Sequence, residues 1–536
     1  MHDAVVVGAG HNGLVAANLL ADAGWDVVVL EAEPHPGGAV RTAEVTLPGF
    51  RHDLFSAFYP LAVASPVLRA LELDRYGLRW CRAPIALAHP TPDGRCAVVS
   101  SQLDESAASL DDYAEGDGAA WRRLFERWSR AGGGVVDALL RPFPPVAAGA
   151  RLVAAVGPSE LARFARFTLL SVRRLAEEEF AGEGGGLLLA GNTLHTDLSP
   201  EATGGALFGW VLASLAQQHG YPVPEGGAGE LISALVRRLE ARGGRIECDA
   251  RVARVEVRNG RAVAVRTADG TEVGARRAVL ADVGAPALYL DLVGVEHLPS
   301  RVLQDVSRFE YDAGTVKVDW ALEGPVPWTA DAARRAGTVH LAESLDHLSE
   351  VAFQLATGWL PARPFVIFGQ QTVADPTRAP DGAATGWGYA HVPQRCKGDA
   401  AGKLSGCWDE GEGEAFADRI EEQVEQRAPG FRSLVRARHV MAPPALQAAD
   451  ANLVGGAVNG GTAQLYQQLV FRPLPGLGRA ETPIRALYLA SASAHPGGGV
   501  HGACGANAAR AALAGDRVRR VLSRPWIQRR TQATDA

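Results

Sequence analysis

Two glycine-rich stretches, one near each end of the chain, have the spacing that holds a dinucleotide phosphate. The N-terminal stretch reads GAGHNG and the C-terminal one GGGVHG, so that each contains G-x-G-x-x-G: Gly8, Gly10, Gly13 and Gly497, Gly499, Gly502. In this pattern the first glycine permits a tight turn, the second lets the backbone approach a pyrophosphate, and the third lets a helix pack closely. The chain therefore binds either two dinucleotides or one dinucleotide held from both ends.

The N-terminal glycines are surrounded by the elements of a nucleotide-binding unit. A β-branched run over 4–7 precedes them, a helical pattern over 12–23 follows, and the next strand, WDVVVLE, ends in an acid eighteen residues after Gly13. The helix N-terminus offers N–H groups to a diphosphate, and Glu31 is placed to accept hydrogen bonds from ribose hydroxyls. A purely structural glycine turn is the alternative, but strand, helix and acid in register favour binding. The expected contacts are Gly8, Ala9, Gly10, Asn12, Gly13, Glu31 and Ala32.

Bulk properties exclude several classes of function. The chain has 536 residues, 47% of them hydrophobic, and a net charge of -7 with basic residues dispersed among acidic ones, so nucleic acid is not an expected partner. The six cysteines form neither C-x-x-C nor a zinc-like spacing, so we expect no redox disulfide and no metal site. With no secretory signal at the N-terminus, and an uncharged run over 202–224 that is interrupted by glutamines and prolines, a cytoplasmic location is predicted.

The rest of the chain predicts a second domain interleaved with the first. Residues 68–220 show helical pattern with few strand signals, 221–290 return to a helix and short strands with turns at Asn259-Gly260 and Asp269-Gly270, and 291–444 contain the alternating strand GTVKVDWAL. We expect an α/β fold with a Rossmann nucleotide-binding domain (1–67, 221–290 and 445–536, including a C-terminal tail) and an α+β substrate domain (68–220 and 291–444). Substrates usually sit in the cleft between such domains.

One helix, predicted over 158–180, allows two interpretations. Its apolar side chains share a face with arginines opposite, as in a helix packed on a core. A basic amphipathic helix can also lie in a membrane interface and collect a lipophilic substrate, although the acidic run at 177–179 argues against this. A peripheral membrane contact is therefore a secondary prediction.

Several motifs spread over nearly the whole chain resemble those of one flavoprotein group. They are GAGHNGLVAANLLADAGWDVVVLEA, PGGAVRT, TLPGFRHDLFSAFYPL, SPVLRALEL, DPTRAPDG and YLASASAHPGGGVHGACGANAARAAL. The chain resembles phytoene-desaturase-related FAD enzymes of the amine oxidase superfamily, and within them the branch containing pyridine nucleotide-disulfide oxidoreductase domain-containing protein 2. The resemblance implies a glutathione-reductase-like FAD domain and hydride removal from a lipophilic or small organic molecule. Disulfide chemistry is not expected without C-x-x-C, and His11-Asn12 replace the GAGIGGL pattern usual in carotene desaturases.

The resemblance also assigns cofactor contacts beyond the first turn. The glycine pair Gly37-Gly38 and Arg41 would continue the diphosphate contact, although relatives often carry the basic residue directly after the pair, where Ala39 stands here. Val252 would meet the adenine through its backbone. At the C-terminal loop, Gly498, Gly499 and Val500 would approach the flavin end, and Ser491 stands where many relatives have an acid.

Candidate catalytic residues come from segments that line the flavin's reactive side in relatives. We single out Tyr466 and His501, with Gln464, Gln467, Arg472 and the group His52, Asp53, Ser56 and Tyr59 nearby. Each also has an ordinary structural interpretation, as a core aromatic, a turn residue or a loop residue bonded to backbone. Cys504 could tether the flavin, or pack a helix.

Only one dinucleotide is predicted. After the C-terminal glycines, about twenty arginine-rich residues follow the predicted helix over 502–515, with no second strand ending in an acid. The prediction is thus an FAD-dependent desaturase, dehydrogenase or oxidase. A reduced-FAD isomerase and a flavin-stabilised binding protein remain alternatives, and the electron acceptor can be oxygen, a quinone or a diffusible carrier.

Overall fold

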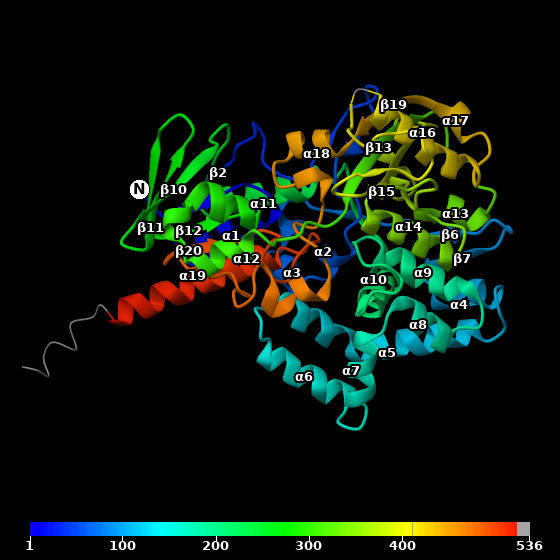
Figure 1. The fold of residues 1–536 in the computed structure, drawn as a ribbon, viewed down its shortest axis with the longest axis horizontal. Coiled ribbons are helices and arrows are strands. Elements are labelled where there is room, and N and C mark those ends of the chain that lie inside the picture. Colours follow the sequence, from blue (N-terminus) through cyan, green and yellow to red (C-terminus); the bar gives the residue numbers. More distant parts are fainter. Residues whose placement is uncertain (410, 523–536) are drawn as a thin grey trace, which may run out of the picture.

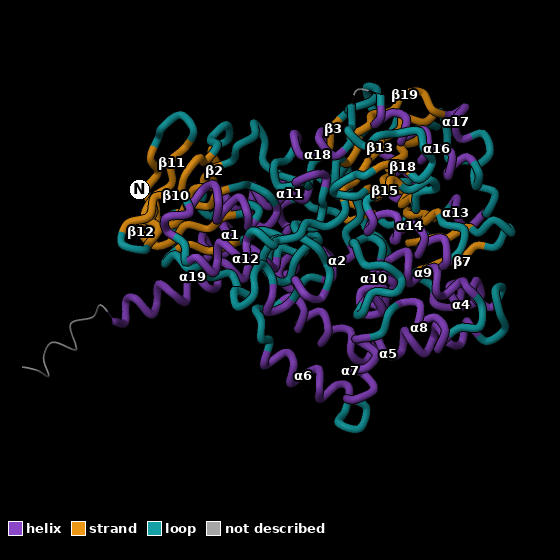
Figure 2. The backbone as a smooth tube through the Cα atoms, in the orientation of Figure 1, coloured by secondary structure: helices purple, strands orange, loops and turns teal. Residues whose placement is uncertain are grey.

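The computed structural model describes residues 1–409 and 411–522. Two separate β-sheets stand at opposite sides of the molecule, and a group of helices lies beneath the second sheet (Figure 1). Figure 2 shows loop segments running between the two sheets, where the chain passes repeatedly from one to the other. These crossings place loops from distant parts of the sequence side by side.

The first sheet is built around β1 (His2–Val7). β1 pairs in parallel with β2 (Val27–Leu30) on one side and with β12 (Glu272–Ala281) on the other. β9 (Arg245–Glu247) extends the parallel sheet beyond β2, and β20 (Leu487–Leu489) extends it beyond β12. The start, middle and end of the chain therefore share one sheet.

A β-meander continues the first sheet. β10 (Val252–Arg258) and β11 (Arg261–Thr267) are antiparallel, and β11 pairs with the first half of β12. Asn259 and Gly260 both have positive φ, at 51° and 68°, as a two-residue hairpin turn requires. The strands and turn expected here are confirmed.

Alternation of side chains gives the first sheet two buried faces. Ala4 and Val6 of β1 belong to the core that includes α1 (His11–Asp22), α11 (Gly229–Ala241) and α19 (Ala503–Leu522), and α1 contacts both other helices. Val5 and Val7 point the other way, into a core with β10, β11 and the π-helix η2 (Ala287–Val293). The β-branched run is buried on both sides, as in parallel sheets.

The second sheet has seven strands. Their order is β19 (Val435–Met441), β13 (Gly314–Leu322), β17 (Ala384–Val392), β16 (Val366–Gly369), β14 (Ala336–Leu341), β6 (Ile85–Pro90) and β7 (Cys96–Ser100). Neighbouring strands are antiparallel except β14 and β6. The segment 68–220, expected to be helical, thus supplies two strands, because the short apolar run over 85–90 is buried on both faces.

The two faces of the second sheet have different partners. Val316, Val318 and Trp320 of β13 pack with α16 (Glu412–Glu425). Lys317 and Asp319, which alternate with them, point to the opposite face and are also buried. That opposite face is covered in part by helices of the segment 183–219.

The helices beneath the second sheet come from the segment after β7. They are α4 (Leu103–Asp111), α5 (Asp117–Leu140), α6 (Val146–Val156), α7 (Leu161–Leu169), α8 (Val172–Glu179), α9 (Glu183–Thr193) and α10 (Gly205–His219). The single helix predicted over 158–180 is in fact α7 and α8, because Leu170 is extended and the Ser171 hydroxyl accepts a hydrogen bond from the Arg174 N–H as the cap of α8. The uncharged run over 202–224 contains α10, much of which is buried.

Shorter elements complete the fold. The other α-helices are α2 (Pro60–Ala64), α3 (Pro66–Ala70), α12 (Ser300–Val306), α13 (Asp331–Arg334), α14 (Leu345–Thr357), α15 (Gln371–Ala374), α17 (Phe431–Leu434) and α18 (Pro443–Ala449). The C-terminal helix α19 runs to Leu522, seven residues beyond the predicted end, and residues 523–536 of the expected tail lie outside the described residues.

Candidate active site

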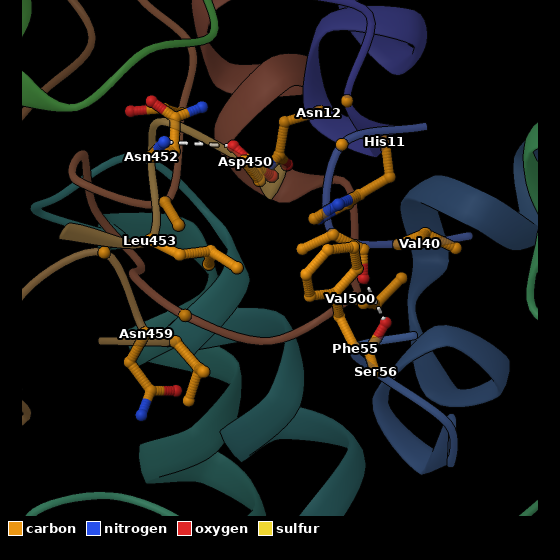
Figure 3. Close-up of a pocket in the computed structure, with 18 of the residues that line it drawn as sticks. His11, Asn12, Val40, Phe55, Ser56, Asp450, Asn452, Leu453, Asn459 and Val500 are labelled. Atoms are coloured by element: carbon orange, nitrogen blue, oxygen red, sulfur yellow. Dashed lines mark hydrogen bonds between the residues drawn. The ribbon is translucent and has the colours of Figure 1, made fainter. Parts of the chain in front are cut away.

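One cavity of about 980 Å³ has walls from both sheets. Residues at the ends of β1 and β2 line one part of it, and side chains of β13, β16 and β17 line another. In Figure 3, His11, Phe55 and Val500 stand on one side of the open space, opposite Leu453 and Asn459. A ligand that fills the cavity would therefore touch segments from the whole length of the chain.

The turn between β1 and α1 requires its three glycines. Gly8 has φ +91°, and a Cβ on it would lie 2.9 Å from the carbonyl oxygen of Asp282. A Cβ on Gly10 would lie 2.7 Å from Asp282 Oδ2, and one on Gly13 would lie 2.2 Å from the Gly8 carbonyl oxygen. Bare backbone is thus exposed to the cavity at Gly8 and Gly10, which line it together with Asn12. Gly13 supports the turn from behind, as a close helix-strand contact requires.

Asp282, at the end of β12, was not foreseen as a site residue. Its Oδ2 accepts a 2.8 Å hydrogen bond from the Gly13 N–H at the start of α1. Burial raises the pKa of this carboxyl to about 8, although the Gly13 bond acts in the opposite direction. The residue that caps α1 from outside is therefore a protonated acid at neutral pH, which suits a site for an anionic diphosphate.

Glu31 closes the other side of the turn. Its Oε2 accepts a 2.7 Å bond from the Ala9 N–H, and its Oε1 accepts one of 3.0 Å from the Glu33 N–H. Glu31, Ala32 and Val252 all line the cavity, whereas Ala9 is not among the lining residues. Backbone N–H groups therefore hold the Glu31 carboxylate at the cavity wall, and its contact with a ribose stays a prediction.

The glycine pair continues along the same wall. Gly37 has φ +140°, and its N–H donates to the Ala9 carbonyl at 3.0 Å, so it joins the turn without lining the cavity. Gly38 and Arg41 do line it. The Arg41 guanidinium lies 5.1 Å from the centre of the Phe55 ring and donates to the Ala449 carbonyl, while its Nε is buried without a partner among the described residues.

The C-terminal glycine loop lies on the same side of this cavity as the N-terminal turn, with Val500 near His11 in Figure 3. The lining residues here include all those expected: Ser491, Gly498, Gly499, Val500 and His501. Helix α19 follows the loop and packs on α1, and no further strand follows β20 in the chain as described through residue 522. The two glycine motifs therefore form a single site.

The candidate catalytic residues separate into two groups. His501 is buried, lines the cavity and accepts a 3.0 Å hydrogen bond at Nδ1 from the Ala503 N–H; burial lowers its pKa to about 3, so the ring is neutral. Tyr466 is 61% exposed, donates to Glu310 and is not among the cavity-lining residues. Its selection as a catalytic residue is corrected here, because a loop whose apolar side chains face solvent carries it away from the site.

The other residues singled out near these candidates also differ in whether they line the cavity. Ser56 and Tyr59 line the cavity. The Arg472 guanidinium is buried and donates to backbone carbonyls of Asn459, Gly461, Thr462 and Ala492, so it holds the loops together from behind. The buried Cys504 thiol donates to the carbonyls of Ala494 and Gly497, and it does not line the cavity.

A second group of lining residues was missed because its members come from ordinary strands and turns. On the second sheet, Lys317 pairs with Tyr389, Tyr389 with Ile367, and Ile367 with His340, which forms one row across four strands. The buried Lys317 ammonium donates to the Asp53 carbonyl at 2.8 Å and to the Asp319 carboxylate. The only sequence signal was the polar half of the alternation in GTVKVDWAL.

The residues of the first sheet fit FAD. Gly10, the N-cap residue of α1, has no side chain, so apart from the Gly13 N–H, which Asp282 accepts, the first N–H groups of the helix are left for a phosphate. His11 Nε2 and Arg41 Nε are buried cavity-wall atoms without partners in the described part of the chain, and oxygen atoms of a cofactor would satisfy them.

Comparisons with known proteins agree with this geometry. A family model described as flavin containing amine oxidoreductase matches residues 13–351, which is more than half of the chain. The chain belongs to the flavin-containing amine oxidoreductase family. As a member it binds FAD and is an FAD-dependent oxidoreductase with an α/β FAD-binding fold, as the sequence predicted.

The similarity to two relatives and to one solved structure covers nearly the whole chain. Pyridine nucleotide-disulfide oxidoreductase domain-containing protein 2 of Mus musculus is 28% identical, over 95% of this chain and 92% of the mouse protein. A lycopene-forming phytoene desaturase of Pseudescherichia vulneris is 27% identical, over 96% of this chain and 99% of the desaturase. The structure of an oxidoreductase from Methanosarcina mazei shares the fold, with a TM-score of 0.62 and 17% identity over 95% of this chain and 99% of that one.

None of the described helices combines the length and the apolar character needed to cross a bilayer.

Proposed function

We propose that this flavoprotein removes a hydride from a lipophilic or small organic molecule and leaves a double bond in it. The observation that carries the proposal is that one continuous cavity joins the residues expected to contact FAD to an apolar space beside the second sheet. We call that space the substrate chamber; its apolar lining is Leu207, Phe208, Val211, Leu212, Ile367 and Trp387. The four residues from α10 face the strands across it.

The chamber is suited to hydride transfer because it can keep the reacting atoms dry and close. Bound FAD supplies the hydride acceptor, and the protein supplies orientation and electrostatics. Reacting atoms must approach to about 3–3.5 Å, which requires a shaped wall more than a strong base. Lys317 is the buried cation of this wall, and its contact with Asp319 compensates its charge. His501, neutral and buried at the cofactor side, remains our candidate for direct contact with the reacting groups.

The division into domains is part of this proposal. An FAD-binding domain of 1–67, 221–290 and 445–536 and a substrate domain of 68–220 and 291–444 would place the cavity at their junction. The strands of the two sheets are drawn from these segments, which supports the division.

Anaerobic reduction of the flavin tests the proposal. The purified holoenzyme is mixed without oxygen with candidate lipophilic substrates, and we expect the yellow absorbance to bleach with formation of a product that has lost two hydrogens by mass spectrometry. Leu212→Arg, which puts a charge into the chamber, should abolish bleaching while FAD stays bound. Leu290→Arg is the matched control, because Leu290 is exposed at the surface.

Two results would contradict the proposal. A product of unchanged mass formed only by the reduced holoenzyme would indicate an isomerase. Tight, saturable binding of a ligand that undergoes no reaction would indicate a flavin-stabilised binding protein.

A further inference from the structure

A buried histidine, His340, meets a half-buried one, His195, at the wall of the cavity. His195, in the turn that follows α9, lines the cavity, and its Nε2 lies 2.9 Å from Nε2 of His340 on β14. The His195 carbonyl is 3.5 Å from the side-chain amide of Asn459, which stands on the cavity wall in Figure 3. His195 is therefore tied on one side to the second sheet and on the other to the loops near the cofactor.

The pair has a defined tautomer. Burial lowers the pKa of His195 to about 3 and that of His340 well below its usual value, so both rings are neutral and one N–H must lie between the two Nε2 atoms. His340 Nδ1 is buried and has no hydrogen-bond partner among the described residues. A proton there would be an unsatisfied buried donor, which is costly, whereas a lone pair there is tolerated more easily. The proton of His340 is therefore on Nε2 and is donated to His195.

The tautomer of His195 follows from that of His340. Because His195 Nε2 accepts this bond, the single proton of the neutral His195 ring is on Nδ1. In the described part of the chain Nδ1 has no partner, and it is the ring nitrogen left to face the cavity. The chamber thus contains a fixed N–H donor at His195, whereas the ammonium of Lys317 on the same wall donates to Asp53 and Asp319.

The surrounding residues make room for this arrangement. A Cβ on Gly191 of α9 would lie 2.3 Å from His340 Nδ1, so only glycine at 191 lets the ring sit against the helix. His340 is held in the sheet row with Ile367, and the Phe365 ring packs edge-on against it at 5.4 Å between ring centres. The donor is therefore positioned by the fold and not by a flexible loop.

We propose that His195 determines substrate specificity by donating a hydrogen bond from Nδ1 to an accepting oxygen of the substrate. The molecule that this enzyme oxidises is then an oxygenated lipophile, such as a ketone, and not a pure hydrocarbon. This inference rests on the proposed function, because it names the substrate class of the same chamber. His340 is a positioning residue that acts through His195.

A matched pair of probes tests the donor. Benzophenone and diphenylmethane have the same carbon skeleton and differ in a carbonyl oxygen, and calorimetry of each with the holoenzyme gives two dissociation constants. We expect benzophenone to bind about tenfold more tightly, as one buried hydrogen bond allows. The ratio should fall to near one in His195→Phe and to an intermediate value in His340→Phe. His35→Phe, at an exposed histidine, is the control and should keep the wild-type ratio.

A second measurement reads the tautomer without a ligand. Nitrogen-15 spectra of histidine-labelled holoenzyme, assigned with the same variants, should show His195 protonated at Nδ1 and His340 at Nε2. Equal affinity for the two probes, no saturable binding of benzophenone, or a proton on His195 Nε2 would each overturn the inference. Neither readout needs turnover, so failure to bleach the flavin would contradict the proposed function without contradicting the assignment of the His195 Nδ1 donor.

Discussion

Gly505 of α19 lies directly against Asn12 of α1: a Cβ on Gly505 would stand 1.9 Å from the Asn12 carbonyl oxygen, and the Gly505 N–H is 3.5 Å from the Asn12 side-chain oxygen. This contact joins the helix after the C-terminal glycine loop to the helix after the N-terminal one. It is the reason that the two glycine motifs make one site, with Asn12 itself on the cavity wall.

Gly505→Ala should therefore separate α19 from α1. We expect a loss of about 3 kcal/mol in the free energy of unfolding, since overpacking against rigid backbone is costly, together with weaker FAD retention. Urea unfolding and the FAD content after gel filtration measure the two effects. Gly149→Ala in α6 is the control, because its Cβ meets nothing within 4 Å and alanine favours helix, so stability should stay equal or rise. Equal stability of the two variants would show that the helices are not held by this contact.

Asp282 predicts a pH dependence of stability. Burial raises its folded-state pKa to about 8, above the ordinary value of 3.8. Between about pH 4 and pH 8 the unfolded chain loses this proton while the folded chain keeps it, so the carboxyl destabilises the fold increasingly as pH rises through that window.

Asp282→Asn keeps an oxygen acceptor for the Gly13 N–H and removes the titration. Its melting temperature should exceed that of the wild type most at pH 9 and least at pH 5, and it should retain FAD at the higher pH. Asp331→Asn, at an exposed position, should follow the wild-type curve. Parallel curves for Asp282→Asn and wild type would show that the carboxyl is ionised throughout.

Lys317 and Asp319 should behave as a coupled pair. Lys317→Met leaves Asp319 buried without its cation and should cost about 3–5 kcal/mol of stability, as for other broken buried pairs. Asp319→Asn should be destabilising as well, and the double variant should be more stable than the sum of the single effects predicts. Urea unfolding of the four proteins gives the coupling energy; strict additivity would mean that the carbonyl of Asp53 alone holds the ammonium.

Tyr466 should be dispensable for the reaction. Its hydroxyl bonds to Glu310 at the surface, outside the cavity, so Tyr466→Phe should change anaerobic flavin reduction by less than about twofold and stability by about 1 kcal/mol at most. Stopped-flow absorbance with the substrate found above measures the rate. A large loss of rate would restore Tyr466 as a catalytic candidate.

A peripheral membrane contact also remains a prediction. Val146 of α6 and Leu169 of α7 are 75% and 58% exposed, with arginines on the same helices. If this face collects a lipophilic substrate, Leu169→Glu should weaken co-sedimentation with phosphatidylglycerol-containing vesicles about tenfold, from lost burial and added repulsion. Glu225→Gln, on the segment before α11, is a control. No sedimentation of the wild type would remove the prediction.

The nucleotide-binding unit at the N-terminus could be predicted from sequence. The order of strand, glycine turn, helix, strand and acid is local, and each part needs only its neighbours, so Gly8, Gly10 and Glu31 could be placed together before the cavity that they line was known. The β-branched runs of β1 and β2 were equally readable, because a strand buried on both faces is apolar at nearly every position. The prediction of one helix over 158–180 was wrong, because the break at Leu170 depends on the Ser171 cap of α8, and the apolar pattern carries no sign of that cap.

The polar side chains around the cavity could not be predicted from sequence, because the pairing of distant elements brings them together. Asp282, Lys317, His195 and His340 lie far apart in the chain, and each resembles an ordinary strand or turn residue in sequence. Strand register places Lys317 and His340 in one row across the second sheet. The turn after α9 brings His195 into hydrogen-bond contact with His340. Tyr466 was chosen as a catalytic candidate from its sequence context, but it lies at the surface. The physical reason is that local pattern fixes which faces of an element are apolar, whereas the pairing of distant elements fixes which polar side chains meet.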